Sequence, residues 1–422
     1  MKVHFITHGC KANQYDTETF RQELEARGAD IVDSPDEADA CVVNTCTVTH
    51  KADRTARKAI RSVKRDNPNT KVVVAGCSAA QRTDDYTGMD EVFGVVEGHD
   101  QIEVANLIAP ESPYLDKHEE PVGAELLDHH EPRTRGWIKV QDGCDRNCAF
   151  CATKLARGAS RSRDPDAIVE EAKRLSRRHC ELVFTGIHIG HYGRDLSARG
   201  ESQEHTLSTL IARLLEEVPD VRFRLGSIEA TEIDDLMIDL LEQSGGRLVP
   251  HLHVPMQAGS NKVLRRMRRW HTREDYRDRL IEIAGRLPYL GLGADVMVGF
   301  PGETHDDFLK TRELVEELPY TYLHVFPFSA REGTAAEEMD GKVDPEVKAR
   351  RSKELRELAM DKGERYRASR VGQAAEIVVE TDDTGMTEDY LRVGLTGDPD
   401  TRIGDRIYAP LEMEDGELVA RV

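Results

Sequence analysis

The 422-residue sequence contains no apolar run that approaches the about 20 residues a helix needs to span a bilayer. Its first residues also lack the long apolar region and small-residue cleavage site of a secretion signal. These absences exclude a protein with membrane-spanning helices, and we expect a cytoplasmic protein without a membrane partner. A chain of this length can bury a large core, and length alone suggests about two to four domains.

Positive charge is also scarce, with 58 Lys and Arg against 78 Asp and Glu and a formal net charge of -20. Nucleic-acid phosphates need Lys and Arg, so this balance is unfavourable for RNA, and we expect no DNA partner. Total charge governs solubility, whereas binding depends on local charge. Arginine clusters at residues 157–163 and 265–269 therefore still allow one basic RNA-binding face. The surplus of carboxylates leads to the hypothesis of a halophilic host.

The apolar runs divide the chain into blocks. Residues 1–113 alternate strand-like and helix-like segments, which predicts an α/β domain with a flavodoxin-like parallel sheet. The strands are expected at residues 3–7, 40–44 and 71–75, and the helices between them at 16–27 and 52–64. Residues 114–132 have little periodicity and are interpreted as a linker.

Residues 133–365 contain further strand–helix units, which predict a partial (βα)6 barrel with functional groups at the C-terminal ends of its strands. These strands are expected at residues 136–140, 182–186, 221–225, 251–254, 293–298 and 322–326. A charged helix at residues 346–366 follows. In residues 366–422, short strand-like runs separated by Gly- and Asp-rich turns predict a small β-barrel, a shape often used to bind oligonucleotides.

Eight cysteines without an export signal indicate metal ligation or catalysis rather than a disulfide framework. Cys144, Cys148 and Cys151 stand in DGCDRNCAFC, directly after the first expected barrel strand. Three thiolates on one loop can hold three irons of a [4Fe–4S] cluster, leaving the fourth open to a molecule such as S-adenosylmethionine. A zinc loop is the alternative, but zinc sites usually need four ligands. Cys41 and Cys180 lack partners at ligand spacing and are assigned to packing.

Cys10, Cys46 and Cys77 are far apart in sequence, yet each follows one of the strand-like runs of the first block. Equivalent strand ends meet at one edge of a parallel sheet, so the three thiols should converge there and hold a second cluster. Gly9 and Gly76 would let the chain turn tightly beside it. Three unrelated buried cysteines are the alternative.

Several segments resemble one family, the radical S-adenosylmethionine methylthiotransferases. Its N-terminal domain is similar to THGCKANQYDTE at 7–18, NTCTVT at 44–49 and AGCS at 75–78. Its radical domain is similar to DGCDRNCAFC at 142–151 and ARGASRSR at 156–163, and its RNA-binding TRAM module to the terminal β block. Three further segments look most like the branch of this family that acts on N6-threonylcarbamoyladenosine. They are TGIHIGHYGRD at 185–195, GSIE at 226–229 and HLHVPMQAGS at 251–260. His8 departs from the family pattern, in which an apolar residue is expected.

The resemblance implies two [4Fe–4S] clusters and S-adenosylmethionine. The cluster on the loop of residues 144–151 would cleave S-adenosylmethionine to a radical that removes hydrogen from adenine C2. The cluster on Cys10, Cys46 and Cys77 would supply the methylated sulfur. The implied substrate is adenosine 37 in the anticodon stem-loop of tRNA, and the implied partners are a reducing electron donor and a sulfur source.

Residues at the ends of the expected barrel strands are candidates for holding S-adenosylmethionine, namely Gly186, Ser227, Glu229, Gln257 and Gly299. Each is about as often a turn or packing residue. Contacts with RNA phosphates or the threonyl carboxylate suit the arginines that follow the cluster loop, Arg157, Arg161 and Arg163. For such a charge run, a solvated face is the alternative.

Other functions are also compatible with these patterns. A non-catalytic RNA-binding iron–sulfur protein would use the β module, but purely structural clusters usually have four protein ligands. A methylthiotransferase of related specificity would act on N6-isopentenyladenosine in tRNA or on an aspartate of a ribosomal protein.

Overall fold

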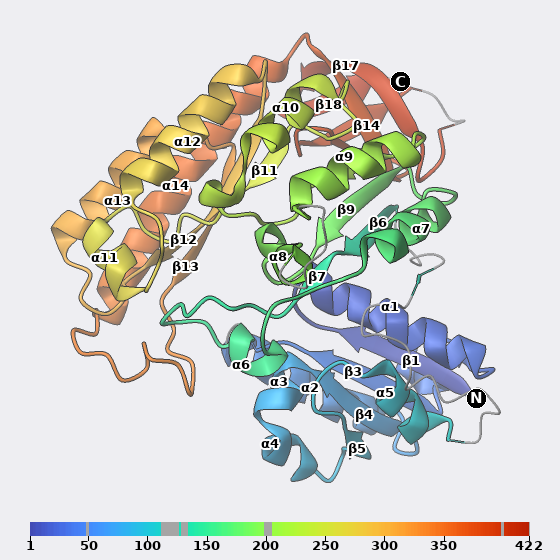
Figure 1. The fold of residues 1–422 in the computed structure, drawn as a ribbon. Coiled ribbons are helices and arrows are strands. Elements are labelled where there is room, and N and C mark those ends of the chain that lie inside the picture. The colour runs from blue at the N-terminus through green and yellow to red at the C-terminus, as the bar shows by residue number, and fades with distance from the viewer. Residues whose placement is uncertain (48–49, 111–125, 128–133, 198–204, 398–400, 422) are drawn as a thin grey trace.

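The computed structural model describes residues 1–47, 50–110, 126–127, 134–197, 205–397 and 401–421. In Figure 1 the N-terminal α/β unit lies at the bottom, a larger central unit above it, and a small barrel of C-terminal strands at the upper right. The expected linker at residues 114–132 falls almost entirely outside the described residues. Within the described ranges, no helix is long and apolar enough to cross a membrane.

The N-terminal unit is a parallel sheet in the order β2-β1-β3-β4-β5, the flavodoxin-like order. Its strands are β1 (Lys2–Thr7), β2 (Asp30–Ile31), β3 (Ala40–Thr45), β4 (Lys71–Gly76) and β5 (Gly94–Val95). Its helices are α1 (Lys11–Ala26), η1 (Pro35–Glu37), α2 (His50–Asp66), α3 (Cys77–Gln81), α4 (Thr83–Thr87) and α5 (Gln101–Ile108). α1 and α5 cover one face of the sheet and α2 and α4 the other, so β3 is buried along its whole length.

The central unit contains six parallel strands, β6 (Arg135–Lys139), β9 (Glu181–Thr185), β10 (Arg222–Arg224), β11 (His251–His253), β12 (Gly291–Val298) and β13 (Tyr322–Pro327). They form two three-stranded sheets. Isolated bridges connect these sheets, one between Phe223 and Leu248 and one between Ser227 and His253. The expected partial barrel is therefore confirmed. Its main helices are α7 (Pro165–Leu175), α9 (Leu207–Glu217), α10 (Asp235–Gln243), α12 (Arg273–Arg286) and α13 (His305–Glu317).

Shorter elements sit mainly at the strand ends of this barrel. They are β7 (Gln141–Asp142), α6 (Thr153–Arg157), β8 (Arg161–Ser162), η3 (Ile189–His191), α8 (Arg194–Ser197), η4 (Ala230–Glu232) and α11 (Asn261–Arg266). α6 and β8 follow the second cysteine loop, and α1 of the N-terminal unit packs against β6.

The barrel strands present two different faces because their successive side chains alternate. Phe184, Phe223 and Val296 belong to the core cluster that includes the surrounding helices. The alternate positions therefore face the inside of the barrel, where polar Glu181, Arg224, Asp295 and His324 accompany apolar Trp137 and Val183. We call this surface the inner face.

The long helix α14 (Pro345–Arg370) leads into a closed barrel in the order β14-β15-β16-β18-β17. Its strands are β14 (Ala374–Thr381), β15 (Thr384–Thr387), β16 (Arg392–Thr396), β17 (Arg406–Glu414) and β18 (Glu417–Arg421). The small β-barrel expected from residue 366 is confirmed, although α14 continues past that residue. Buried Arg222 and Arg224 attach the barrel to the central unit by donating to Glu376 O and Glu388 O.

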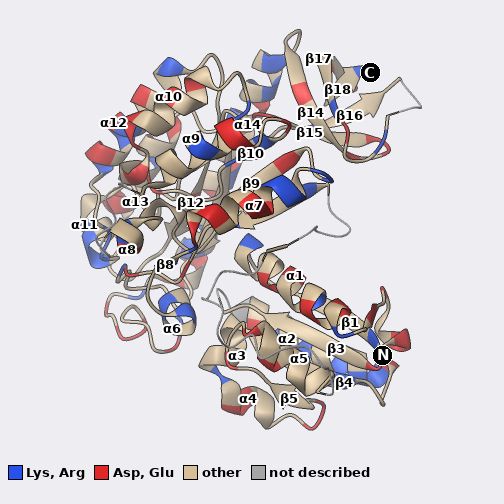
Figure 2. Ribbon diagram, turned by 45° about the vertical axis from the view of Figure 1, so that its right-hand side comes forward, with Lys and Arg blue, Asp and Glu red and all other residues tan. Residues whose placement is uncertain are grey.

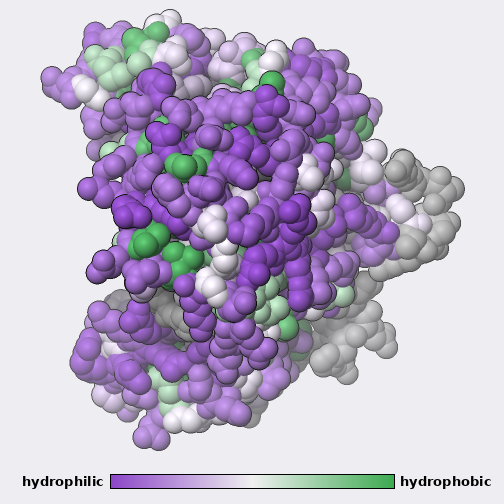
Figure 3. Space-filling model, turned by 90° about the vertical axis from the view of Figure 1, so that its left-hand side faces the viewer, coloured by the Kyte–Doolittle hydropathy of each residue, from purple (hydrophilic) through white to green (hydrophobic). Residues whose placement is uncertain are grey.

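Charge and polarity at the surface are mixed. In Figure 2, Asp and Glu alternate with Lys and Arg along the outer helices, while basic residues gather on α6 and α11. The face seen in Figure 3 is hydrophilic over most of its area and carries only small apolar patches. Lys and Arg are thus distributed unevenly along the chain, within a fold whose charges are otherwise mixed.

Candidate metal centres and substrate site

Cys10, Cys46 and Cys77 lie at the C-terminal edge of the N-terminal sheet. Cys10 precedes α1, Cys46 follows β3, and Cys77 begins α3 directly after β4. Because β1, β3 and β4 are parallel neighbours, these positions are adjacent. Gly9 has a φ of +106°, and a Cβ atom there would lie 2.9 Å from Cys46 Sγ, so only glycine fits this turn. The structure brings together three thiols that are distant in sequence.

Arg157 lies beside this first triad, although it belongs to α6 after the other cysteine loop. Its Nε donates to Cys77 Sγ at 3.3 Å, and its Nη2 donates to Asn13 Oδ1 at 2.7 Å. Asp16 and Asp142 pair with the guanidinium at 2.6 Å and 2.9 Å. Its side chain is 0% exposed and lies against the first triad. The expected contact of Arg157 with RNA phosphate or the threonyl carboxylate stays a prediction.

The charges around Arg157 shift the protonation of its neighbours. Burial raises the pKa of the Cys77 thiol to about 11, and the guanidinium opposes that rise. Burial, with help from Arg157, lowers the pKa of His99 to about 3, so the imidazole is neutral and its Nε2 accepts from Arg157 at 2.9 Å. Burial alone would raise the pKa of Asp142, but Lys139 and Arg157 hold it well below its usual range. Arg157 therefore stays charged beside a thiol.

The second triad, Cys144, Cys148 and Cys151, lies on the loop after β7. The loop is compact, because the N–H of Cys151 donates to Cys148 O at 3.2 Å and that of Cys144 to Gly158 O at 3.0 Å. Burial raises the pKa of the Cys144 thiol to about 11, and the nearby Cys151 and Cys148 add to the rise. The three thiols of this loop are thus close neighbours as well.

Two side chains from the barrel approach this second triad. Arg269 Nη1 donates to Cys148 Sγ at 3.6 Å, and its Nη2 pairs with buried Glu229. His188 Nδ1 lies 3.4 Å from Cys144 Sγ, while its Nε2 lies 2.8 Å from Glu232 Oε2. Glu229 was expected at this site, and it reaches the cluster loop only through Arg269.

The donor set fits an iron–sulfur cluster at each triad. Each triad offers three thiols and has one guanidinium against it, which would offset the negative charge of a thiolate-bound cluster. Neither of the other cysteines can serve as a fourth ligand. Cys41 is buried inside β3, where burial raises its pKa to about 12, and Cys180 stands directly before β9 at the opposite end of that strand. One iron of each cluster would thus lack a thiolate.

The other expected site residues have mixed surroundings. Gly186 packs against Gln141, Ser227 is exposed, Gln257 has a φ of +62°, and Gly299 gives room to Lys348 of α14. Among the arginines expected to contact RNA, Arg161 is exposed, whereas Arg163 is buried and pairs with Glu171 at 3.0 Å. The expected role of Arg163 in RNA or substrate contact stays a prediction, and its partner in the structure is Glu171. His8 lies beside the first triad, where burial lowers its pKa.

Sequence reasoning missed several residues of the site. Asn13 and Asp16 fall within the quoted 7–18 segment, and His188 and His191 within the 185–195 segment, but none carried a ligand-spacing signal. His188 and His191 both contact Glu232, at 2.8 Å and 3.2 Å, and the three side chains could hold a metal ion. Asp142 opens the quoted 142–151 segment but was given no role, and no local pattern distinguishes Glu232 or His99 from ordinary surface residues.

The inner face offers a second group of polar side chains. His253 Nε2 and His324 Nδ1 lie 3.2 Å and 3.3 Å from Asp295 Oδ1. His253 Nδ1 also lies 3.1 Å from Tyr322 Oη, whose ring covers Gly293. Across the barrel, Lys11 of α1 reaches the ring of Trp137 on β6. The inner face is thus suited to a polar ligand.

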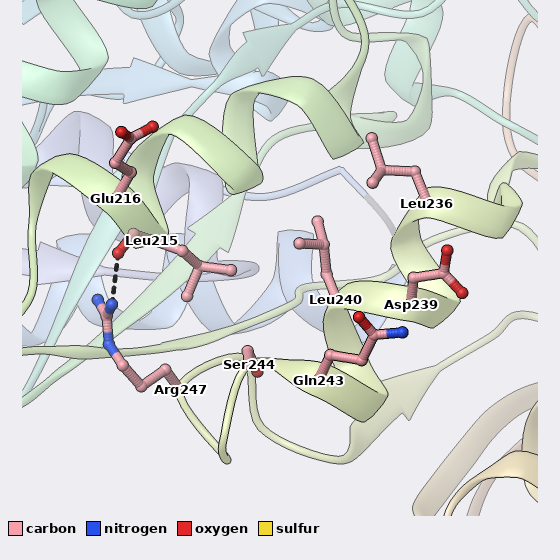
Figure 4. A pocket seen from close by; sticks show the side chains of 8 residues that line it. All are labelled: Leu215, Glu216, Leu236, Asp239, Leu240, Gln243, Ser244 and Arg247. Atoms are coloured by element: carbon pink, nitrogen blue, oxygen red, sulfur yellow. Dashed lines mark hydrogen bonds between the residues drawn. The ribbon is translucent and has the colours of Figure 1, made fainter.

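A pocket of about 420 Å³ lies elsewhere, on the outside of the central unit between α9 and α10 (Figure 4). Apolar Leu215, Leu236 and Leu240 line it with the aliphatic part of Arg247, whose guanidinium donates to Leu215 O. It contains no cysteine, so we do not assign it to the chemistry of the triads.

Family models match both large units. Residues 138–315 match the Radical SAM superfamily, and residues 2–97 match the uncharacterized protein family UPF0004. A solved radical S-adenosylmethionine methyltransferase, TsrM from Kitasatospora setae, shares the fold with a TM-score of 0.57 and 15% identity, over 80% of this chain and 74% of that chain. The barrel and its three-cysteine loop define a radical SAM enzyme.

Curated relatives narrow the class. The threonylcarbamoyladenosine tRNA methylthiotransferase MtaB of Bacillus subtilis is 36% identical over 94% of this chain and 91% of its own length. The tRNA-2-methylthio-N(6)-dimethylallyladenosine synthase of Carboxydothermus hydrogenoformans is 31% identical over 94% of this chain and 93% of its own. The chain belongs to the radical SAM methylthiotransferase family, and it is an MtaB-like transferase.

Proposed function

We propose that this enzyme attaches a methylthio group to C2 of N6-threonylcarbamoyladenosine at position 37, in the anticodon stem-loop of tRNA. The observation that carries the proposal is the link between the two cysteine triads, in which Arg157 from the loop of one donates to Cys77 of the other. The substrate in the name of the Bacillus subtilis relative supports the choice of nucleoside.

Two [4Fe–4S] clusters and S-adenosylmethionine are the cofactors of this proposal. When bound, they would supply the electron, the radical chemistry at C2 and the methylated sulfur. Cys144, Cys148 and Cys151 would hold the cluster that binds S-adenosylmethionine, and the first triad would hold the auxiliary cluster. The proposed contacts of S-adenosylmethionine are Gly186, Ser227, Glu229, Gln257 and Gly299.

The chain's own residues would hold and shield this site. Arg157 stands on α6, which follows the loop of the second triad. Its ion pairs with Asp16 and Asp142 would hold that loop against the sheet edge that carries the first triad. Its complete burial excludes water from the space beside Cys77. Arg269, held by Glu229, has the same role beside Cys148.

The polarity of the inner face favours the threonylcarbamoyl nucleoside over the runner-up, N6-isopentenyladenosine. The N6 group of the first carries amide, hydroxyl and carboxylate groups, whereas an isopentenyl group is apolar. His253, Asp295 and His324 form a hydrogen-bonding surface. An apolar group placed against it would displace water from these side chains without offering them hydrogen bonds in exchange.

The tRNA would contact basic residues near the second triad and the C-terminal barrel. Arg161 is exposed, as are Arg265 and Arg268 at α11. The closed β-barrel supports a TRAM-like RNA-binding role. A cytoplasmic electron donor and a sulfur source complete the proposed partners, because the reaction consumes an electron and a sulfur atom that no residue of the chain regenerates.

The test is mass spectrometry of tRNA nucleosides from a strain lacking this gene. We expect 2-methylthio-N6-threonylcarbamoyladenosine to disappear while its unmodified precursor accumulates. Loss of the isopentenyl product instead, or of a methylthio-aspartate in a ribosomal protein, would move the enzyme to the respective branch. Unchanged levels of all three would contradict methylthio transfer.

We also propose a host that lives at high salt, on the strength of the net charge of -20. The free energy of unfolding, measured by urea denaturation at low and at multimolar KCl, should be higher in the salt. Equal stability in both solutions would contradict this proposal.

A further inference from the structure

Lys11 occupies an unusual position between the N-terminal unit and the barrel. It is the first residue of α1 and directly follows Cys10. α1 packs against β6. The Lys11 Nζ lies 5.4 Å from the centre of the Trp137 ring on that strand, outside its own unit. Lys11 is partly buried there and Trp137 is buried. An ammonium group thus enters the inner face beside a flat apolar wall.

The other cations near Lys11 are paired. Arg135 binds Glu380 at 2.6 Å, and Arg222 and Arg224 share Glu181 at 2.6 Å and 2.7 Å. Glu181, whose charge acts on Lys11, is already paired with two guanidinium groups. No carboxylate of the described residues forms an ion pair with Lys11, which leaves its charge uncompensated. Such a charge is stabilised when an anion enters.

We infer that Lys11 binds the carboxylate of the substrate's threonylcarbamoyl group, an inference that rests on the proposed function. The only anion that this nucleoside carries on its base is that carboxylate. An ammonium–carboxylate pair in a desolvated site is strong. It is also selective, because a carboxylate that entered this site without a cationic partner would lose its hydration and gain nothing in return. Lys11 would therefore select the acidic nucleoside and disfavour the apolar isopentenyl one.

The position of Lys11 relative to the C-terminal end of β6 suits binding of the threonylcarbamoyl carboxylate. Trp137 stands two residues before Lys139, the last residue of β6, so it lies about 7 Å below the strand end. The cysteine loop leaves from that end of the strand. A base held at the strand ends can thus direct its extended N6 chain down the inner face toward Lys11.

The experiment measures RNA binding to anaerobically prepared, cluster-loaded enzyme by fluorescence anisotropy. Three anticodon stem-loop RNAs carry at position 37 the threonylcarbamoyl nucleoside, its methyl ester, or unmodified adenosine. We expect the wild type to bind the acid at least about tenfold more tightly than the ester. Lys11→Met should bind acid and ester equally and leave the affinity for the unmodified RNA unchanged, while Lys11→Arg should keep a preference for the acid.

Lys71→Met is the matched control, since Lys71 also lies over an aromatic ring, 4.9 Å from the centre of Phe93, but on the N-terminal unit away from the barrel. It should keep the full preference for the acid. Equal binding of acid and ester by the wild type would overturn the inference without any variant. So would a preference that survives in Lys11→Met, or an equal loss for all three RNAs. Failure of the proposed function would differ, because wild-type enzyme would then methylthiolate isopentenyl RNA and not threonylcarbamoyl RNA.

Discussion

Arg157 Nε donates to Cys77 Sγ at 3.3 Å, a contact between two units that joins residues 80 positions apart in sequence. One buried cation therefore touches a thiol of the first triad while its backbone belongs to the loop of the second. Because Asp16 and Asp142 come from different units and both pair with it, the contact fixes the relative position of the two triads.

Replacing Arg157 by Gln should make the auxiliary cluster harder to reduce, since the guanidinium stabilises the extra negative charge of the reduced state. Spectroscopic redox titration of the loaded enzyme should give a more negative potential. The free energy of unfolding should fall by about 3 kcal/mol, because two carboxylates lose a buried partner. Arg61→Gln, which breaks an exposed pair with Glu91 at 3.9 Å, is the control and should change neither. An unchanged potential in Arg157→Gln would refute the charge effect.

The two triads should fail in different ways. Cys148→Ala should abolish cleavage of S-adenosylmethionine, because the cluster that binds it would lose a ligand. Cys46→Ala should lose the auxiliary cluster and all methylthio transfer, yet still release 5′-deoxyadenosine when reduced. Chromatographic measurement of 5′-deoxyadenosine separates the two variants. Complete loss of cleavage in Cys46→Ala as well would mean that the division of roles is wrong.

Much of this arrangement could be predicted from the sequence. The triads followed from cysteines at the ends of apolar runs, because parallel strands align such ends, and the six barrel strands followed from their apolar runs. The inward turn of Arg157 could not be predicted, because it depends on the packing of two units. β2 and β5 of the N-terminal sheet were missed because each has only two residues.

The carboxyl group of Glu181 should make the free energy of unfolding depend on pH. Burial alone would raise its pKa, but Arg224 and Arg222 hold it well below the ordinary value of glutamate. A carboxyl whose pKa is lowered in the folded state stabilises the fold above its unfolded pKa, about 4.3, and this contribution is lost as the pH falls. Glu181→Gln should cost about 3 kcal/mol at pH 7. Urea denaturation should show the gap to wild type narrowing below about pH 4.3, and a gap independent of pH would contradict the assignment.

Gly293→Ala should disturb the inner face. A Cβ atom at Gly293 would overlap with the Tyr322 ring, whose Oη lies 2.9 Å from His251 Nε2 and 3.1 Å from His253 Nδ1. Displacing the ring should lower the free energy of unfolding by about 1–3 kcal/mol. Gly285→Ala is the matched control, since nothing lies near its Cβ position on α12, and it should be neutral or slightly stabilising. A Gly293 variant as stable as that control would show that the ring moves freely.

The most direct measurement is the iron content of enzyme prepared without oxygen, by metal analysis with Mössbauer spectroscopy of the same sample. Two triads that each hold a [4Fe–4S] cluster predict about eight irons per chain, and about four in Cys46→Ala. About four irons in the wild type would contradict the presence of two clusters. It would also contradict the proposal that the auxiliary cluster supplies sulfur to a base activated by the cluster that binds S-adenosylmethionine.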